Sequence, residues 1–262
     1  MKTWGNLTAA SAAAALLLGA GAAGPVTAAT TGDAAGPSTA GATDAAPVVI
    51  ARYSFDRAKP GGAVADDSGH GHTLTPSAGH GGRIKLAARA AGHAASFPAK
   101  CGRRTAAKKC PHAVLQAPDA PELNPGAAPI RYGATVRLAR RQTGSGENIL
   151  QKGYSASGSQ YKLQVDGAAG RPSCVMSDDV VRGIHVARSD VSIADGRWHT
   201  LECRRSGPAL TLLVDGAVHA TAEIPATLTI TNAVPLSIGG KGDGADNDQF
   251  HGAVDDVWIA LG

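Results

Sequence analysis

The sequence predicts an all-β protein in which two antiparallel sheets stack against each other. Apolar and polar residues alternate over residues 132–138 and 161–165, which is the period of a strand with one buried face. The turn dipeptides Asp195-Gly196 and Asp215-Gly216 separate apolar runs. Beyond residue 46, no stretch has a sustained helical period with capping residues. Short strands divided by frequent turns are typical of a β-sandwich.

Residues 1–28 are predicted to form a secretory signal peptide. Lys2 supplies a positive charge, residues 9–23 are apolar, and Val26-Thr27-Ala28 fits a cleavage site of small residues. A transmembrane anchor is the alternative, but this apolar stretch is short and interrupted by glycines. No cysteine lies near the cleavage point to carry a lipid. We therefore expect a secreted, extracellular protein without membrane insertion.

The remaining chain divides into a linker and one domain. Residues 29–46 are mostly Ala, Gly, Thr, Ser, Asp and Pro, which predicts a flexible linker with little to bury. Residues 47–262 contain the predicted strands and suffice for one β-sandwich domain. The first strand is expected over residues 48–55, where alternate residues from Val49 to Phe55 share one face.

The four cysteines are predicted to form two disulfides. Their number is even and they follow an export signal, so oxidation is the expected use. Three pairings are possible. We favour Cys101 with Cys110, which closes a short basic loop, and Cys174 with Cys203, which would staple strands together. A zinc site is the alternative, but the sequence lacks a close Cys-x-x-Cys pair.

Several motifs occur in the order found in a known family. The strongest is Asp195-Gly196-Arg197-Trp198-His199, followed by an apolar strand ending in Val214-Asp215-Gly216. The others lie at residues 53–56, 66–72, 236–240 and 250–259. Together they resemble bacterial laminin G-like domains of the concanavalin A-like superfamily. This resemblance implies a jelly-roll β-sandwich, a fold that hosts enzymes, lectins and adhesion modules alike.

The charge balance does not indicate a nucleic-acid partner. The net charge is +4 and the isoelectric point is about 9.0. However, the arginines are scattered along alternating strands, and no basic stripe is interleaved with aromatic residues. A basic secreted protein can instead associate with anionic cell-wall or extracellular polymers.

The sequence favours a protein without catalytic activity. The resemblance extends to glucanases, whose two catalytic carboxyl groups lie in a Glu-x-Asp-x-x-Glu type of motif on one strand. This chain has no such motif, and its four glutamates, Glu122, Glu147, Glu202 and Glu223, are well separated. The neighbouring aspartates Asp255 and Asp256 would point to opposite faces of a strand.

A structural calcium ion is a further expectation. The resemblance implies calcium between an early loop and the last strand, and aspartate oxygens are suitable ligands. By alternation, Asp255 should share a face with Val257 and Ile259, so its carboxylate would be buried and require compensation. A calcium ion shared with Asp67 would provide it. Backbone N–H groups and an arginine are the equally weighted alternative.

The candidate ligand-binding residues are Tyr154, Asp246 and Asn247. A sugar site on such a fold usually offers an exposed aromatic ring together with Asp, Asn and Arg side chains. Aromatic residues are scarce, and most should belong to the core, Trp198 among them. Tyr154, in a glycine-flanked loop, is the aromatic residue that we expect to be exposed.

The sequence therefore predicts a secreted, non-catalytic binding module, with carbohydrate or a cell-surface polymer as its partner. A carbohydrate-active enzyme, either a glycoside hydrolase or a lyase, with an unrecognised site is one alternative. A structural or protein-interaction domain is the other.

Overall fold

The computed structural model describes residues 46–89, 92–102, 105–106, 109–156, 158–180 and 183–262. The predicted signal peptide and residues 29–45 of the predicted linker lie outside this part. In this part, helical structure is limited to short 3-10 turns, among them η2 (Pro121–Leu123) and η3 (Arg140–Gln142). No helix in these ranges is long and apolar enough to span a bilayer.

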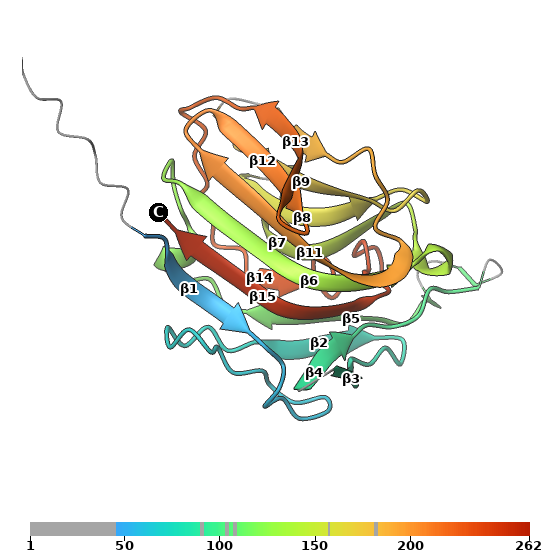
Figure 1. Cartoon of the computed structure of the whole chain (residues 1–262). Helices are drawn as coiled ribbons and strands as arrows, with labels where there is room; N and C mark the ends of the chain where they lie inside the picture. The colour runs from blue at the N-terminus through green and yellow to red at the C-terminus, as the bar shows by residue number, and fades with distance from the viewer. Residues whose placement is uncertain (1–45, 90–91, 103–104, 107–108, 157, 181–182) are drawn as a thin grey trace, which may run out of the picture. The chain divides into compact units, whose positions relative to one another are not determined.

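The strands form two antiparallel sheets, one behind the other in Figure 1. The eight-stranded sheet contains, in spatial order, β13 (Ala217–Glu223), β12 (Ala209–Val214), β11 (Asp195–Ser206), β6 (Ile130–Ala139), β15 (Ala253–Leu261), β4 (Gly92–Ser96) and β3 (Lys85–Arg89), with β1 (Val48–Tyr53) also paired to β15. The seven-stranded sheet contains β10 (His185–Arg188), β9 (Arg171–Ser177), β8 (Gln160–Asp166), β7 (Gly146–Gly153), β14 (Leu236–Ile238), β5 (His112–Ala117) and β2 (Thr75–Gly79). This arrangement confirms the predicted jelly-roll sandwich.

The core lies between the inner faces of the two sheets. On β11, Leu201 and Cys203 are fully buried, and they pair with the buried Ala134 and Tyr132 of β6. The Tyr132 ring lies 5.0 Å from the ring of Tyr161, which β8 contributes from the opposite sheet. Alternation thus buries one side of each strand, and aromatic and aliphatic contacts across the sandwich hold the sheets together.

Both predicted disulfides are confirmed. Cys174 of β9 is bonded to Cys203 of β11, so this bridge joins the seven-stranded sheet to the eight-stranded sheet. Cys101 is bonded to Cys110 and closes the loop that precedes β5. No free cysteine occurs in the described ranges. Cross-linking distant parts of the chain restricts the unfolded state and thereby stabilises the fold.

Trp198 lies on the outer face of the eight-stranded sheet, so the expectation that it faces the core is wrong. The register of β11 shifts between Asp195 and Trp198, and Trp198 then pairs with the exposed Arg137 of β6. The half-buried indole lies 4.5 Å from the guanidinium of Arg89 and 5.0 Å from that of Arg137. Cation–π contacts at the surface, rather than core packing, hold this side chain.

The predicted orientation of Asp255 is also wrong, because β15 contains a bulge. The register with β6 shifts between Asp255 and Trp258, and Asp256 has a positive φ of 45°. One extra residue in a strand reverses the alternation beyond it. Val257 and Ile259 consequently face the core, whereas Asp255 pairs with Thr135 on the outer face.

Candidate ligand-binding cleft

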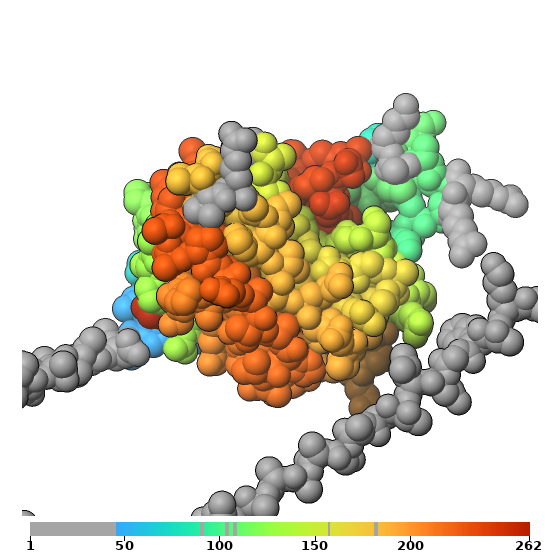
Figure 2. Space-filling model, turned by 90° about the horizontal axis from the view of Figure 1, so that it is seen from above, coloured from blue at the N-terminus to red at the C-terminus, as the bar shows by residue number. Residues whose placement is uncertain are grey.

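A polar cleft of about 600 Å³ opens where three segments meet. These are the loop closed by Cys101 and Cys110, residues 144–147 at the start of β7, and residues 245–251 ahead of β15. Figure 2 shows the red segment near residue 245 beside the green segment near residue 100 and the yellow-green start of β7. The charged and polar side chains of the lining are Lys100, Thr105, His112, Ser145, Glu147, Asp246, Asn247, Asp248, Gln249 and His251.

The segment ahead of β15 is shaped by its own hydrogen bonds. The backbone N–H of Lys241 donates to the carbonyl of Asn247 at 2.8 Å, and Asn247 Nδ2 donates to the carbonyl of Gly242 at 2.9 Å. Gln249 Oε1 accepts from the backbone N–H of Ala113 at 2.7 Å, which ties the segment to β5. The wall of the cleft is therefore formed before any ligand binds.

The structure brings two of the three predicted ligand residues to the cleft. Asp246 lines it with a fully exposed side chain. Asn247 lines it too, but its side chain is buried and engaged within the segment. Tyr154 was expected to be exposed, and this is incorrect: it is half-buried, and its hydroxyl donates to the Lys241 carbonyl at 2.6 Å. Tyr154 supports the segment and is not part of the lining.

Glu147 is a cleft residue that the sequence did not single out. Its side chain is 2% exposed, and Oε2 accepts from the backbone N–H of His251 at 3.5 Å. Oε1 is buried without a hydrogen-bond partner among the described residues. Burial raises the pKa of Glu147 to about 7, although hydrogen bonds from His251 and Gly144 and the charge of Lys100 act in the opposite direction. The cleft thus contains an acid whose charge changes near neutral pH.

Opposite charges are interspersed in the cleft. Asp248 forms an ion pair with Lys241 at 3.2 Å, whereas the carboxylate of Asp246 lies 4.0 Å from the same ammonium group. Lys100 donates to the carbonyl of Thr143. His251 Nδ1 lies 2.8 Å from the carbonyl of Pro98, and burial lowers its pKa. Hydrogen-bond donors and acceptors are therefore both available, as binding of a hydroxyl-rich ligand requires.

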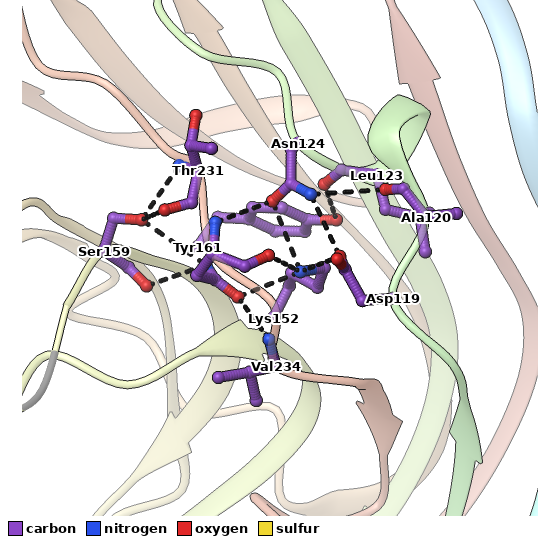
Figure 3. A network of polar contacts seen from close by, with 10 residues as sticks. Asp119, Ala120, Leu123, Asn124, Lys152, Ser159, Tyr161, Thr231 and Val234 are labelled. Carbon is purple, nitrogen blue, oxygen red and sulfur yellow. Dashed lines mark hydrogen bonds and ion pairs between the residues drawn. The ribbon is translucent and has the colours of Figure 1, made fainter.

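A second polar cluster surrounds Lys152 in β7 and has a structural role (Figure 3). Its ammonium group is fully buried and lies 2.7 Å from Asp119 Oδ1. It also donates to the carbonyl oxygen and to Oδ1 of Asn232, at 2.8 and 2.9 Å, and to Oδ1 of Asn124 at 3.3 Å. Burial lowers the pKa of Lys152, and the Asp119 carboxylate opposes that shift. All donors are engaged, so the cluster ties loops to β7 rather than offering a site.

The predicted calcium ligands have partners within the protein. Asp67 Oδ2 accepts from the backbone N–H and the hydroxyl of Ser54, at 3.0 and 2.8 Å, and Oδ1 pairs with Arg57. Asp255 pairs with Arg89. In the part of the chain that the structure describes, no group of three or more His, Cys, Asp or Glu side chains is arranged to hold a metal. Calcium at Asp67 and Asp255 remains a prediction.

Comparison with known proteins shows the superfamily to which the chain belongs. A model of the "Concanavalin A-like lectin/glucanases superfamily" matches residues 130–260, which is half of the chain. Domain 4 of AbnA, a GH43 extracellular arabinanase from Geobacillus stearothermophilus solved in complex with arabinotriose, aligns with a TM-score of 0.60 and 17% identity. The alignment covers 82% of this chain and 93% of that one. No curated protein matches the sequence.

Two toxin structures are also similar. The binding domain of Paraclostridial Mosquitocidal Protein 1 aligns with a TM-score of 0.58 and 12% identity. A structure of botulinum neurotoxin type C, whose cell entry depends on interaction with two ganglioside molecules, aligns with a TM-score of 0.57 and 11% identity. Each alignment covers 81% of this chain and 48% of the toxin chain, so this chain spans about half of their length. At these identities the likeness is one of fold.

Proposed function

Because this chain belongs to the concanavalin A-like lectin/glucanase superfamily, we propose that it is a secreted, non-catalytic module that binds carbohydrate in the cleft beside the Cys101–Cys110 loop. The observation that carries the proposal is the polar lining of a preformed cleft of about 600 Å³. Carboxylates such as Asp246 accept hydrogen bonds from sugar hydroxyls, and the ammonium group of Lys100 donates them. The cleft presents both kinds of group.

The similar structures support a glycan as the ligand. One was solved with arabinotriose, and another belongs to a toxin that interacts with gangliosides. A sandwich of this fold can carry binding loops on a rigid scaffold. In this chain we assign glycan binding to the loops around Asp246, which the two sheets and the Cys101–Cys110 disulfide hold in place.

A glycan array probed with the whole chain tests the proposal. We expect binding to a limited set of oligosaccharides or cell-surface glycans, and loss of those signals in Asp246→Ala. Asp190→Ala is the matched control, because Asp190 is an equally exposed aspartate that does not line the cleft. An array without signal, or equal signals from Asp246→Ala and the wild type, would contradict the proposal.

Glu147 favours hydrolysis as a second candidate function. Its pKa is raised to about 7, which suits a general acid, and Asp246 and Asp248 line the same cleft. A glycosidase needs its two carboxyl groups about 5–9.5 Å apart. Incubation of array-positive polysaccharides with the wild type and with Glu147→Gln separates the two candidates. A binding module releases no product with either protein, whereas an enzyme releases product that Glu147→Gln abolishes.

A further inference from the structure

A small basic pocket adjoins the cleft. It has a volume of about 280 Å³, and Arg137, Arg141 and Ser96 contribute its side-chain donors. Gln142 lines the pocket and connects it to the cleft, because Gln142 Nε2 donates to the carbonyl of His251, a cleft residue. Gly252 lies next to His251 in the chain and also lines the pocket. The cleft and the pocket therefore adjoin at residues 251–252.

The positive charges of this pocket are unbalanced. Its lining contains Arg137 and Arg141 but no carboxylate. Neither arginine takes part in an ion pair among the described residues. Arg89, the other arginine at Trp198, pairs with both Asp255 and Asp256. Two guanidinium groups at one pocket repel each other, and an anion between them would relieve that repulsion.

Both arginines are carried by ordered backbone. Arg137 lies on β6 in the middle of the eight-stranded sheet, paired on one side with Trp198 and on the other with Ala253. Its guanidinium contacts the Trp198 ring. Arg141 belongs to η3, where the Gln142 side chain accepts from the backbone N–H of Ala139 at 2.7 Å. A guanidinium group that is already held in place, as that of Arg137 is by the Trp198 ring, loses less entropy when it binds an oxyanion.

We propose that Arg137 and Arg141 form an anion subsite that binds a carboxylate or sulfate group of an acidic polysaccharide. The glycan part of this inference rests on the proposed function, and the anion part rests on the pocket itself. Carboxylate and sulfate oxygens match the donor geometry of guanidinium groups. Because His251 lines the cleft and the neighbouring Gly252 lines the pocket, one polysaccharide chain that crosses these two residues contacts both sites.

Binding of three immobilised polymers tests the subsite: polygalacturonate for carboxylate, dextran sulfate for sulfate and unmodified dextran as the neutral reference. We expect the whole chain to bind at least one acidic polymer more tightly than dextran. In Arg137→Gln/Arg141→Gln the affinity for that acidic polymer should fall about ten-fold or more, and a ten-fold change corresponds to about 1.4 kcal/mol. The matched control Arg83→Gln/Arg188→Gln removes two exposed arginines elsewhere and should change it less than about two-fold.

Each outcome bears on the subsite. Equal losses in the two double variants would mean that net charge alone attracts the polymer, and would overturn the inference. Equal binding of dextran and both acidic polymers would overturn it as well. Inhibition of binding by inorganic sulfate, if it is lost in Arg137→Gln/Arg141→Gln, supports the inference.

The subsite and the cleft proposal can fail independently. If the arginine pair governs binding but Asp246→Ala leaves every glycan signal intact, the subsite stands and the cleft proposal fails. If binding of neutral glycans depends on Asp246 and acidic glycans are not preferred, the cleft proposal stands and the subsite fails.

Discussion

His199 Nδ1 lies 2.7 Å from Asp215 Oδ2, and this contact explains the most distinctive motif of the sequence. His199 Nε2 lies 3.1 Å from Asp195 Oδ1, so one imidazole joins the start of β11 to the turn after β12. Asp215 and Gly216 both have positive φ values, 52° and 82°, as a type I′ hairpin turn requires. The Asp-Gly-x-Trp-His and Val-Asp-Gly segments therefore have a structural role: they connect β11 to the turn that follows β12.

The first prediction concerns pH and His199. Desolvation lowers its pKa, but hydrogen bonds and charges from Asp215 and Asp195 outweigh that effect, so the pKa is raised above 6.5. The stabilisation is complete below the unfolded-state pKa and is lost as pH rises through the folded-state pKa. We expect His199→Gln to lower the free energy of unfolding by about 1 kcal/mol at pH 5.5 and by less at pH 9. Urea unfolding at both pH values measures this, and a loss that does not depend on pH would refute it.

Glu147 also makes the protein less stable as pH rises, but here the substitution is expected to stabilise the fold. Its pKa rises from 4.5 to about 7 on folding, so the folded state retains a proton that the unfolded state releases. The free energy of unfolding therefore falls as pH rises between those two values. At pH 8, Glu147→Gln should be more stable than the wild type by about 3 kcal/mol, and at pH 4 this gain should vanish. Chemical unfolding of Glu147→Gln and of the exposed control Glu223→Gln measures the difference; a gain shared by both variants contradicts the assignment.

The two disulfides should differ in their effect on stability. Cys174 and Cys203 are separated by 29 positions, and Cys101 and Cys110 by 9. Loop-closure entropy gives about 3–4 kcal/mol for the longer loop and somewhat under 3 kcal/mol for the shorter one. Removing the inter-sheet bridge with Cys174→Ala/Cys203→Ala should therefore lower the urea midpoint more than Cys101→Ala/Cys110→Ala does. The reverse order of midpoints would be inconsistent with this assignment.

Calcium binding by Asp67 and Asp255 predicts a metal-dependent melting temperature. Added calcium should raise the melting temperature and a chelator should reverse the rise, because a ligand that binds only the folded state stabilises it. Asp67→Asn should abolish the response. Asp67 and Asp255 already pair with Arg57 and Arg89, respectively, so compensation by arginine alone is the competing expectation. A melting temperature that neither calcium nor chelator changes would exclude the ion.

Local patterns were sufficient to predict most of the fold. Alternation predicted the strands that contain Tyr132 and Tyr161, and glycine-containing turns marked the hairpin at Asp215. The number and spacing of the cysteines, with the export signal, led to the correct pairing of Cys174 with Cys203. These features depend on residues close in sequence, or on a covalent bond with few possible partners.

The error at Trp198 could have been avoided by alternation, because an odd number of positions separates Trp198 from the buried Leu201 and Cys203 of the same strand. The error at Asp255 occurs where a bulge interrupts the alternation, since one additional residue near Asp256 reversed the orientation of Asp255. The alternation of apolar and polar residues in a sequence cannot reveal such an inserted residue, because the side chains on both sides of the bulge still alternate.

The candidate site was only partly predictable. Asp246 and Asn247 stood out because their loop is polar. Glu147 did not, since its surroundings come from His251 and Lys100, which are distant in the chain. Arg137 and Arg141 likewise meet only through the fold, at the end of β6 and in η3. Sites assembled from separate loops leave no local pattern in the sequence.

The central claim is that the cleft at Asp246 binds a glycan. Isothermal titration of the strongest array ligand into the wild type, Asp246→Ala and Asp190→Ala tests it most directly. Loss of a charge-assisted hydrogen bond costs about 1.5–3 kcal/mol, so the dissociation constant of Asp246→Ala should rise about 10- to 100-fold. Asp190→Ala should bind as the wild type does. Equal dissociation constants for all three proteins would contradict the claim.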